Sequence, residues 1–336
     1  MKKITLKNIA DHLNVSVSTV SKALNGNEEI SKSTTEAIKA YAKEKNYVPN
    51  YNAISLKNQR TRTIGVIIPN MLNYYFAQIL KGIEKTASLN KYKVITCISN
   101  ESLQKEIETI EMLSTGVVDG FILSVAEETQ LKENYGHLNS CKDNEIPLVM
   151  FDRVVDKIDC DKVITNDFIA SSKAVSYLKN KGCKKIAFVG TEIDLSVGKS
   201  RYEGYLAGLK KNDIKRDESI IITTHEMYYK KHESIVKPLF NNEFDALIAS
   251  NESVAIAAMK VAQEKGLKIP DDLSVLAFSN GILARHSNPT LSTISQHGEL
   301  IGEKAATLLI NKLENKITNI ISETVDTDIV LRNSSK

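Results

Sequence analysis

Short apolar runs recur along most of this 336-residue chain and restrict its fold more than any other feature of the sequence. Each run has the length and the content of Val, Ile, Leu and Phe that are typical of a buried strand, and the segments between the runs have helical patterns. Strands that alternate with helices form parallel sheets covered by helices. We therefore expect an α/β body with strands at 63–68, 93–98, 120–125, 147–151, 185–190, 245–250 and 274–278.

The number of these units predicts two subdomains. Seven or more strand units over about 270 residues exceed one compact sheet. We expect two doubly wound parallel-sheet subdomains with a cleft between them, and we place the first boundary near residues 161–165. Open α/β sheets bind ligands in the loops that follow the carboxyl ends of their strands, so the cleft is the expected ligand site.

Composition excludes several classes of protein. Hydrophobic residues make up 42% of the chain and charged residues 25%, which is normal for a protein with a sizeable core. Asn8, Asp11 and His12 interrupt any secretory signal, and no segment reaches the roughly 18 apolar residues of a membrane span, so we expect a cytoplasmic protein. The cysteines at 97, 141, 160 and 183 form no CxxC pair and do not cluster with histidine, so no metal or cofactor is indicated.

The sequence contains none of the catalytic motifs GxGxxG, GxSxG and HExxH. VGKS at 197–200 ends like a phosphate-binding loop. However, seven residues separate Gly198 from the preceding glycine, Gly190, where that loop requires four. We therefore predict that the protein is not an enzyme.

Positive charge is concentrated at the start of the chain. Residues 1–62 contain eleven Lys and Arg but five Asp and Glu, whereas the whole chain has a net charge of only +3. A basic segment on a mildly acidic body favours a polyanionic partner slightly.

Three short helices are predicted within this basic segment. Residues 6–13 and 17–24 have apolar residues at helical spacing; Asn14 can adopt the left-handed turn conformation, and Ser16 is a good N-cap. A third helix at 31–46 offers Ala37, Ile38, Tyr41 and Ala42 to close a core. The outward face of the second helix carries small hydroxyls and a cation, which suit a DNA groove. The alternative is a helical bundle with an ordinary polar surface.

The segment after the third helix has two interpretations. Pro49 disfavours helix at the preceding residue, and Asn50 can cap a new turn that contains Ala53, Ile54 and Leu56. Apolar residues on a basic segment can wedge between base steps in a minor groove. A flexible linker is the alternative.

TLKNIADHLNVSVSTVSKALNG at 5–26, then YVPN with Ala53 and Leu56, then RTIGVIIP at 62–69 resemble the LacI/GalR family of bacterial transcription regulators. The resemblance implies that Val17, Ser18 and Lys22 face bases in the major groove and that Ala53 and Leu56 of a hinge helix enter the minor groove. It also implies phosphate contacts by Thr5, Ser16, Thr19, Ser21 and Asn25. Asn14 replaces the usual glycine, and Lys22 replaces the usual arginine, so guanine should be read more loosely.

The resemblance also implies a domain organisation with a periplasmic-binding-protein-like body. Residues 1–49 would form a helix-turn-helix DNA-binding domain, 50–61 a hinge helix and linker, and 62–332 an effector-binding and dimerisation domain. The chain would cross between subdomains again near 290–296 and 320–323. The subdomains would then comprise 62–163 with 294–321, and 164–293 with 322–332.

Polar and aromatic residues after the predicted strands are the candidate ligand contacts. By the family resemblance they are Asn73, Tyr75, Phe76, Ser124 and Arg153 on one wall and Asn166, Asp167, Arg201, Asn251, Ser279, Asn280 and Gln296 on the other. Amides, a hydroxyl, guanidiniums and rings suit a sugar, although each residue could instead be a loop cap or a surface residue. Ser279 replaces an acidic residue that is common in the family, and this removes a strong acceptor for ligand hydroxyls.

The sequence therefore predicts a repressor that binds a near-palindromic double-stranded DNA operator as a homodimer and responds to a small-molecule effector, with a sugar favoured. The effector would act by changing the angle between the subdomains and hence the affinity for DNA. Two alternatives belong to other classes. A solute-binding protein would begin with a signal peptide, and an α/β enzyme with an accessory helical domain would show turnover.

Overall fold

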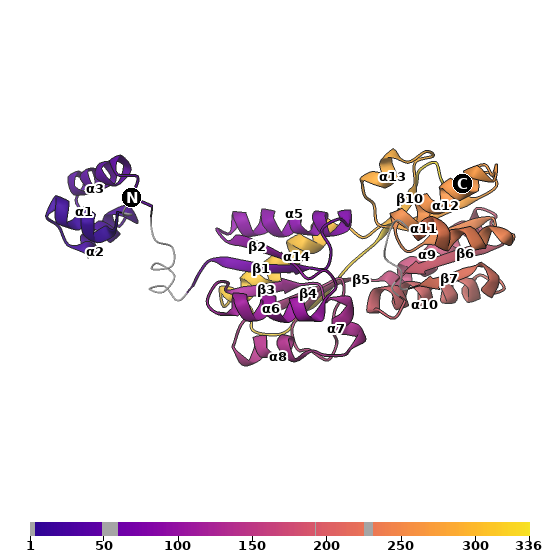
Figure 1. Cartoon of the computed structure of the whole chain (residues 1–336), viewed down its shortest axis with the longest axis horizontal. Coiled ribbons are helices and arrows are strands. Elements are labelled where there is room, and N and C mark those ends of the chain that lie inside the picture. Colours follow the sequence, from indigo (N-terminus) through magenta and orange to yellow (C-terminus); the bar gives the residue numbers. More distant parts are fainter. Residues whose placement is uncertain (1–3, 49–59, 192, 225–230) are drawn as a thin grey trace. The chain divides into compact units, whose positions relative to one another are not determined.

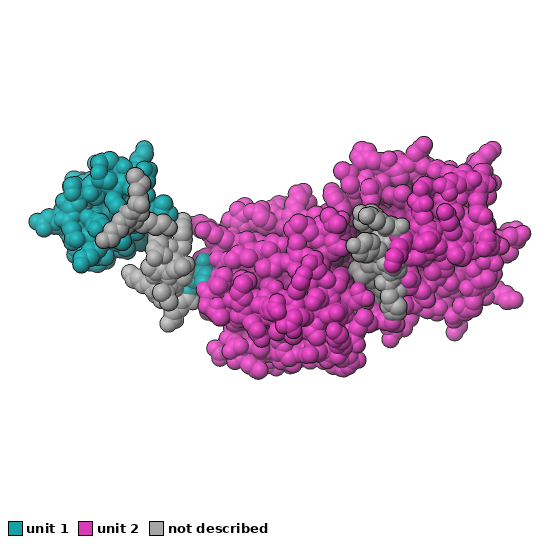
Figure 2. All heavy atoms as spheres, viewed as in Figure 1, with its two compact units in different colours: residues 1–61 teal, residues 62–336 magenta. Residues whose placement is uncertain are grey.

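The computed structural model describes residues 4–48, 60–191, 193–224 and 231–336. The chain divides into two compact units, residues 1–61 and 62–336, which are coloured separately in Figure 2. We call the first unit the head and the second the body. Most of the predicted hinge helix and linker at 50–61 lies outside the described residues.

Three short helices form the described part of the head, and each begins at a hydroxyl side chain. Thr5, Ser16 and Ser31 accept hydrogen bonds from backbone N–H groups in the first turns and so satisfy donors that have no partner within the helix. Asn14 has φ 52° and ψ 44°, which confirms the left-handed turn predicted after the first helix. The helices are α1 (Leu6–Leu13), α2 (Val17–Leu24) and α3 (Lys32–Glu44).

The core of the head consists of Ile9, Ala10, Val20, Ala23, Ile38 and Ala42. Tyr41 packs against this core, as expected. Ala37 is exposed, so its predicted place in the core is wrong. The inward face of α3 is centred on Ile38 and Ala42, which lie one turn apart, and this arrangement turns Ala37 toward solvent.

The first sheet of the body has six parallel strands in the order β11-β5-β4-β3-β1-β2. One face packs on α5 and α14 in a single apolar core, and the other packs on α6 and α8 (Figure 1). The strands are β1 (Thr63–Ile68), β2 (Lys93–Ile98), β3 (Gly120–Leu123), β4 (Leu148–Phe151), β5 (Asp161–Thr165) and β11 (Ser322–Val325). The helices are α5 (Tyr74–Leu89), α6 (Leu103–Ser114), α7 (Glu127–Leu131), α8 (Gly136–Asp143) and α14 (Gly298–Leu313).

The second sheet also has six strands, in the order β12-β10-β9-β8-β6-β7, and β12 alone is antiparallel to its neighbour. α9 and α10 cover one face, and α11, α12 and α13 cover the other. The strands are β6 (Ile186–Thr191), β7 (Ile221–Thr224), β8 (Ala246–Ala249), β9 (Ser274–Phe278), β10 (Ser292–Ser295) and β12 (Asp328–Val330). The helices are α9 (Asp167–Asn180), α10 (Ser196–Lys211), α11 (His232–Val236), α12 (Glu252–Glu264) and α13 (Ile282–His286), with 3-10 turns at Glu218–Ile220 and Lys237–Asn241.

The chain passes between the two sheets three times. It leaves the first sheet after Thr165, returns after Ser295 and leaves again between Val325 and Asp328. Residues 322–325, for which the sequence predicts the second subdomain, form β11 beside β5 in the first sheet. Only Asp326 and Thr327 separate β11 from β12, and the strand pairing decides that the chain crosses there.

Among the strands of the described residues, five lack the apolar runs that identify the other seven. β7, β11 and β12 lie at sheet edges and contain hydroxyl or acidic residues. β10 is buried, yet half of its residues are serines. Ser292 donates a hydrogen bond to the carbonyl of Arg332 at 3.1 Å, so its hydroxyl is satisfied by the returning end of the chain.

Glycines let one pair of helices over each sheet touch backbone to backbone. A Cβ atom at Gly204 of α10 would lie 2.2 Å from the carbonyl oxygen of Phe168 in α9. One at Gly302 of α14 would lie 2.0 Å from the carbonyl oxygen of Ile79 in α5. Non-bonded atoms cannot approach so closely, so any side chain at these positions would push the helices apart.

We expect Gly204→Ala to lower the free energy of unfolding by about 3 kcal/mol, because the added methyl group must displace α10 from α9. Urea denaturation of the full chain measures this change. Gly136→Ala is the matched control, since the nearest atom to a Cβ there lies 3.8 Å away. Equal stability of the two variants would contradict the close helix contact.

Candidate functional site

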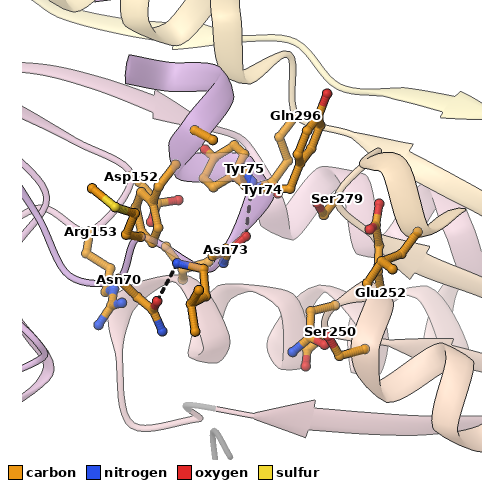
Figure 3. A pocket seen from close by; sticks show the side chains of 18 of the residues that line it. Asn70, Asn73, Tyr74, Tyr75, Asp152, Arg153, Ser250, Glu252, Ser279 and Gln296 are labelled. Carbon is orange, nitrogen blue, oxygen red and sulfur yellow. Dashed lines mark hydrogen bonds between the residues drawn. The ribbon is translucent and has the colours of Figure 1, made fainter. Parts of the chain in front are cut away.

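A cleft of about 570 Å³ lies between the two subdomains of the body. Its walls come from loops at the carboxyl ends of strands in both sheets, as expected for open α/β sheets. Residues 70–77, which follow β1, and Asp152 and Arg153, which follow β4, form one wall; Ser250 to Ser253, after β8, lie on the other (Figure 3). Gln296 lies on the second crossing between the sheets.

The cleft brings together eight of the twelve candidate ligand residues. They are Asn73, Tyr75, Phe76, Arg153, Arg201, Asn251, Ser279 and Gln296. The other four, Ser124, Asn166, Asp167 and Asn280, are not among the lining residues. Asn166 caps α9 by accepting from Ile169 N–H at 3.1 Å, and Asn280 accepts from Arg332, so both have structural bonds. Ser124 is fully buried at the end of β3.

Asp167 lies behind the wall and holds Arg201. The Nε of Arg201 donates to Asp167 Oδ1 at 2.8 Å, and its Nη1 donates to the carbonyl oxygen of Ser250 at 2.9 Å. The guanidinium carbon lies 4.3 Å from the centre of the Phe278 ring, so the cation also stacks on an aromatic face. Thr165 donates to the second oxygen of Asp167 at 2.6 Å.

This arrangement fixes the position and the charge of Arg201 before any ligand binds. The residue lies in the second turn of α10, which begins at Ser196, and does not open the helix. Two guanidinium nitrogens already bond within the protein. Burial lowers the pKa of Arg201, but Asp167 together with Asp152 and Tyr75 outweighs this effect, so the pKa is raised and the group is a permanent cation.

The opposite wall contains an equivalent pair. Arg153 is 3% exposed and donates to both carboxylate oxygens of Glu101, at 2.7 and 2.8 Å. The same carboxylate accepts from the backbone N–H of Glu127 at 2.9 Å, which ties the pair to the start of α7. Both arginines of the cleft are therefore oriented by a carboxylate before any ligand arrives.

Sequence reasoning missed the acidic residues of the cleft: Glu101, Asp152 and Glu252. Glu252 is 6% exposed and accepts a hydrogen bond from the backbone N–H of Gly281, and burial raises its pKa. Asp152 and Glu252 directly adjoin the predicted Arg153 and Asn251, so their position after buried strands was the available signal. An acidic residue at the start of a helix normally stabilises that end of the helix, so the sequence provided no reason to assign Glu252 to the cleft as well.

Glu252 lies on the same wall as Ser279 (Figure 3). An acidic side chain is therefore present on the wall where Ser279 replaces the acidic residue that is common in the family. The φ of Ser279 is 77°, so its backbone adopts the left-handed region that side chains other than glycine seldom occupy. The loop after β9 is held in this shape partly by the bond between Gly281 and Glu252.

Aromatic and apolar groups complete the cleft. Tyr75 is buried, and burial together with Asp152 and Asp167 raises the pKa of its hydroxyl well above its usual range, so the group stays a neutral phenol. Large apolar side chains remain exposed on both walls, and a contiguous set of this kind marks a binding surface. They are Met71, Leu72, Tyr74, Ile282 and Leu283.

The head presents the predicted outward face of α2. Val17 is 44% exposed, and Ser18, Lys22 and Asn25 are exposed as well. Ser21 and Thr19 are partly buried, and Lys22 forms an ion pair with Glu29 across the end of the helix. Thr5 and Ser16 use their hydroxyls as helix caps. Ala53 and Leu56 lie outside the described residues.

Within the described ranges, no group of three or more His, Cys, Asp or Glu side chains could hold a metal ion. No helix there is long and apolar enough to span a membrane. The cysteines are free, and burial raises the pKa of the Cys141 and Cys160 thiols to about 12 and about 11. These two thiols are therefore poor nucleophiles.

Comparisons with known families match both units. Residues 5–50 match the family "Bacterial regulatory proteins, lacI family", and residues 175–335 match "Periplasmic binding protein-like domain". The ribose operon repressor of Halalkalibacterium halodurans is 30% identical over 334 residues, which cover 99% of this chain and 97% of that protein.

Solved structures confirm the fold class that the sequence predicts. The lac repressor dimer bound to operator and the anti-inducer ONPF has a TM-score of 0.88 at 21% identity, and the match covers 99% of each chain. A LacI family transcriptional regulator from Enterococcus faecium with bound ribose has a TM-score of 0.71 at 24% identity, covering 81% of this chain and 98% of that one.

We expect Arg201→Ala to lower the free energy of unfolding by about 3 kcal/mol, because it leaves the buried Asp167 carboxylate without its cation. The sequence alone predicts no such loss, since it does not reveal the ion pair. Arg201→Ala/Asp167→Ala should be less destabilised than the sum of the two single variants. Urea denaturation of all four proteins gives this interaction energy. A value near zero would mean that the pair does not stabilise the fold.

Proposed function

Because this chain belongs to the LacI family of bacterial regulatory proteins, it is a DNA-binding repressor regulated by a small-molecule effector, and we propose that this effector is a sugar bound in the cleft of the body. Members of the family are regulators and not enzymes, and they act on DNA in the cytoplasm. We assign DNA binding to residues 1–49, the hinge to 50–61, and effector binding and dimerisation to 62–332.

The observation that carries the sugar proposal is the mixture of oriented donors and acceptors in the cleft. Arg201 and Arg153 donate, Glu252 and Asp152 accept, and the amide of Asn251 can do both. Sugar hydroxyls donate and accept at once, so they can satisfy such a set. A relative over nearly the whole chain is named a ribose operon repressor, which places ribose first among the sugars to test.

We propose that the head binds one half of a near-palindromic operator and that two chains bind together as a homodimer. Val17, Ser18 and Lys22 would contact bases, and phosphate contacts would come from Thr5, Ser16, Thr19, Ser21 and Asn25. Ala53 and Leu56 would enter the central minor groove. One short head contacts too little DNA for selectivity, and paired heads read symmetric half-sites. The lac repressor structure of similar fold is likewise a dimer bound to its operator.

Effector and operator would be coupled through the angle between the subdomains. The cleft has contacts on both walls, and three crossings join the sheets, so a ligand that touches both walls stabilises one angle over others. Residues of both subdomains meet at the second crossing. There the Nε2 of Gln296 lies 3.5 Å from the hydroxyl of Thr165 and 3.5 Å from Oδ1 of Asp167. Whether the effector strengthens or weakens operator binding would depend on which angle between the subdomains favours DNA binding by the paired heads.

A thermal-shift screen of pentoses, hexoses and disaccharides, with ribose first, tests the effector proposal. We expect one sugar to raise the Tm of the full chain, because a ligand that binds only the folded state stabilises it. Arg201→Lys keeps a cation beside Asp167 but loses the planar guanidinium. It should therefore weaken the binding of that sugar by about 2 kcal/mol. A screen in which no sugar shifts the Tm would contradict a sugar effector.

A second test concerns the head. Lys22→Ala should weaken binding to the preferred operator by roughly 1 to 3 kcal/mol and reduce discrimination between sites, because a base contact is lost. Fluorescence anisotropy with labelled duplexes measures both effects. Lys39→Ala removes an exposed cation from α3 and is the control. If both variants lose affinity equally on every sequence, Lys22 contacts only phosphates.

A further inference from the structure

An amide side chain joins the two subdomains of the body at the start of α10. The Nε2 of Gln130, near the end of α7, donates to the hydroxyl of Ser196 at 3.1 Å and to the carbonyl oxygen of Val154 at 2.9 Å. The Oε1 of the same amide accepts from the backbone N–H of Ser196 at 3.3 Å. Gln130 and Val154 lie in the subdomain of the first sheet and Ser196 in that of the second. We call these three hydrogen bonds the clasp; α7 lies on the side of its subdomain that faces α10 (Figure 1).

α10 obtains a cap for its first turn from this amide. The other two long helices described over the second sheet, α9 and α12, begin at Asn166 and Asn251, whose side chains accept from backbone N–H groups of their own helix. α10 follows Leu195, whose apolar side chain cannot act as a cap. The Oε1 of Gln130 therefore supplies, from the other subdomain, an acceptor that the cap residue of α10 lacks.

The clasp also connects the two segments that carry the arginines of the cleft. Val154 directly follows Arg153 in the chain, and Arg201 lies in the second turn of the helix that begins at Ser196. Val197, the next residue of this helix, lines the cleft. A change in the distance between the two arginine-bearing segments therefore stretches or breaks the clasp.

The bonds of the clasp between the subdomains are weaker than the bonds within each wall. Ser196 is exposed, so water competes for both of its bonds to Gln130, and such bonds between neutral groups contribute modestly to stability. Arg153 and Arg201 instead form charge-assisted bonds to carboxylates at nearly buried atoms. A change of the angle between the subdomains thus breaks the clasp before it disrupts either wall.

We propose that Gln130 is a positioning residue for the effector response: its clasp to Ser196 holds the walls at the angle of this structure, and the subdomains change angle by releasing it. This inference rests on the proposed function, because it assigns the regulation of the same cleft. A ligand that fits the clasped angle stabilises the clasp, and a ligand that fits another angle competes with it. Either kind of ligand changes operator affinity through the same contact.

Distances between two spin labels report the angle between the subdomains without any ligand. Lys142→Cys on α8 and Lys210→Cys on α10 place the labels at exposed positions of different subdomains. Cys97→Ser removes the partly exposed native thiol, and the other three thiols are buried. The labelled full chain is exchanged into a large excess of unlabelled chains, so that distances within one chain dominate.

Gln130→Ala removes the clasp, and Gln263→Ala is the matched control. The Nε2 of Gln263 donates to the carbonyl oxygen of Asn288 at 2.8 Å, so the control loses a glutamine bond within one subdomain. We expect pulsed dipolar spectroscopy to show that Gln130→Ala lowers the ratio of the parental distance to other distances about fivefold, because two bonds between the subdomains are lost. Gln263→Ala should keep the parental distribution. Equal distributions for the two variants would overturn the proposal.

Operator affinity then shows whether the clasp takes part in regulation. We expect Gln130→Ala to change the Kd of the ligand-free full chain for its preferred operator about fivefold, measured by fluorescence anisotropy, because the angle and DNA binding are linked. Calorimetry should show a changed Kd for ribose too, and Gln263→Ala should change neither constant. A new distance distribution with parental operator affinity would overturn the regulatory role. If operator affinity depends on Gln130 but neither ribose nor another sugar binds, the sugar function is wrong and the clasp stands.

Discussion

The contact of α9 with α10 determines where the main charged pair of the cleft forms. Gly204 lies three residues after Arg201, and Phe168, whose carbonyl it approaches, directly follows Asp167. The distance between the two helix backbones therefore fixes the distance between guanidinium and carboxylate. A buried pair is stable only when its geometry is good, so the position of Arg201 in the cleft depends on a residue without a side chain.

Each wall of the cleft orients its arginine with a carboxylate, but the two carboxylates are held in different ways. On one wall a helix pair holds Arg201 against Asp167, while on the other the Arg153 and Glu101 pair is tied to the backbone at the start of α7. Each cation is oriented and largely neutralised within its own subdomain. Polar atoms of both walls are thus held in place around the cleft.

This division of roles fits a regulator better than a catalyst. Arg153, Arg201 and Glu252 are held in structural pairs or by a backbone N–H group, and the described thiols with strongly raised pKa values are buried away from the cleft. Three crossings make the two walls parts of one hinged body, and a ligand that contacts both can select one arrangement. The head is a separate compact unit with its own core.

The sequence by itself determined the elements with strong local signals. The first two helices of the head, the turn at Asn14, the seven apolar strands and the two-sheet body all follow from periodicity, caps and apolar runs, and a family motif identified the head. Only the tertiary structure decided that β11 joins the first sheet, that Asp167 supports Arg201 from behind, and that Glu252 lies on the same wall as Ser279. Strand pairing and charge pairing join residues far apart in the chain, and their energies depend on distances between those residues, about which local sequence patterns carry no information.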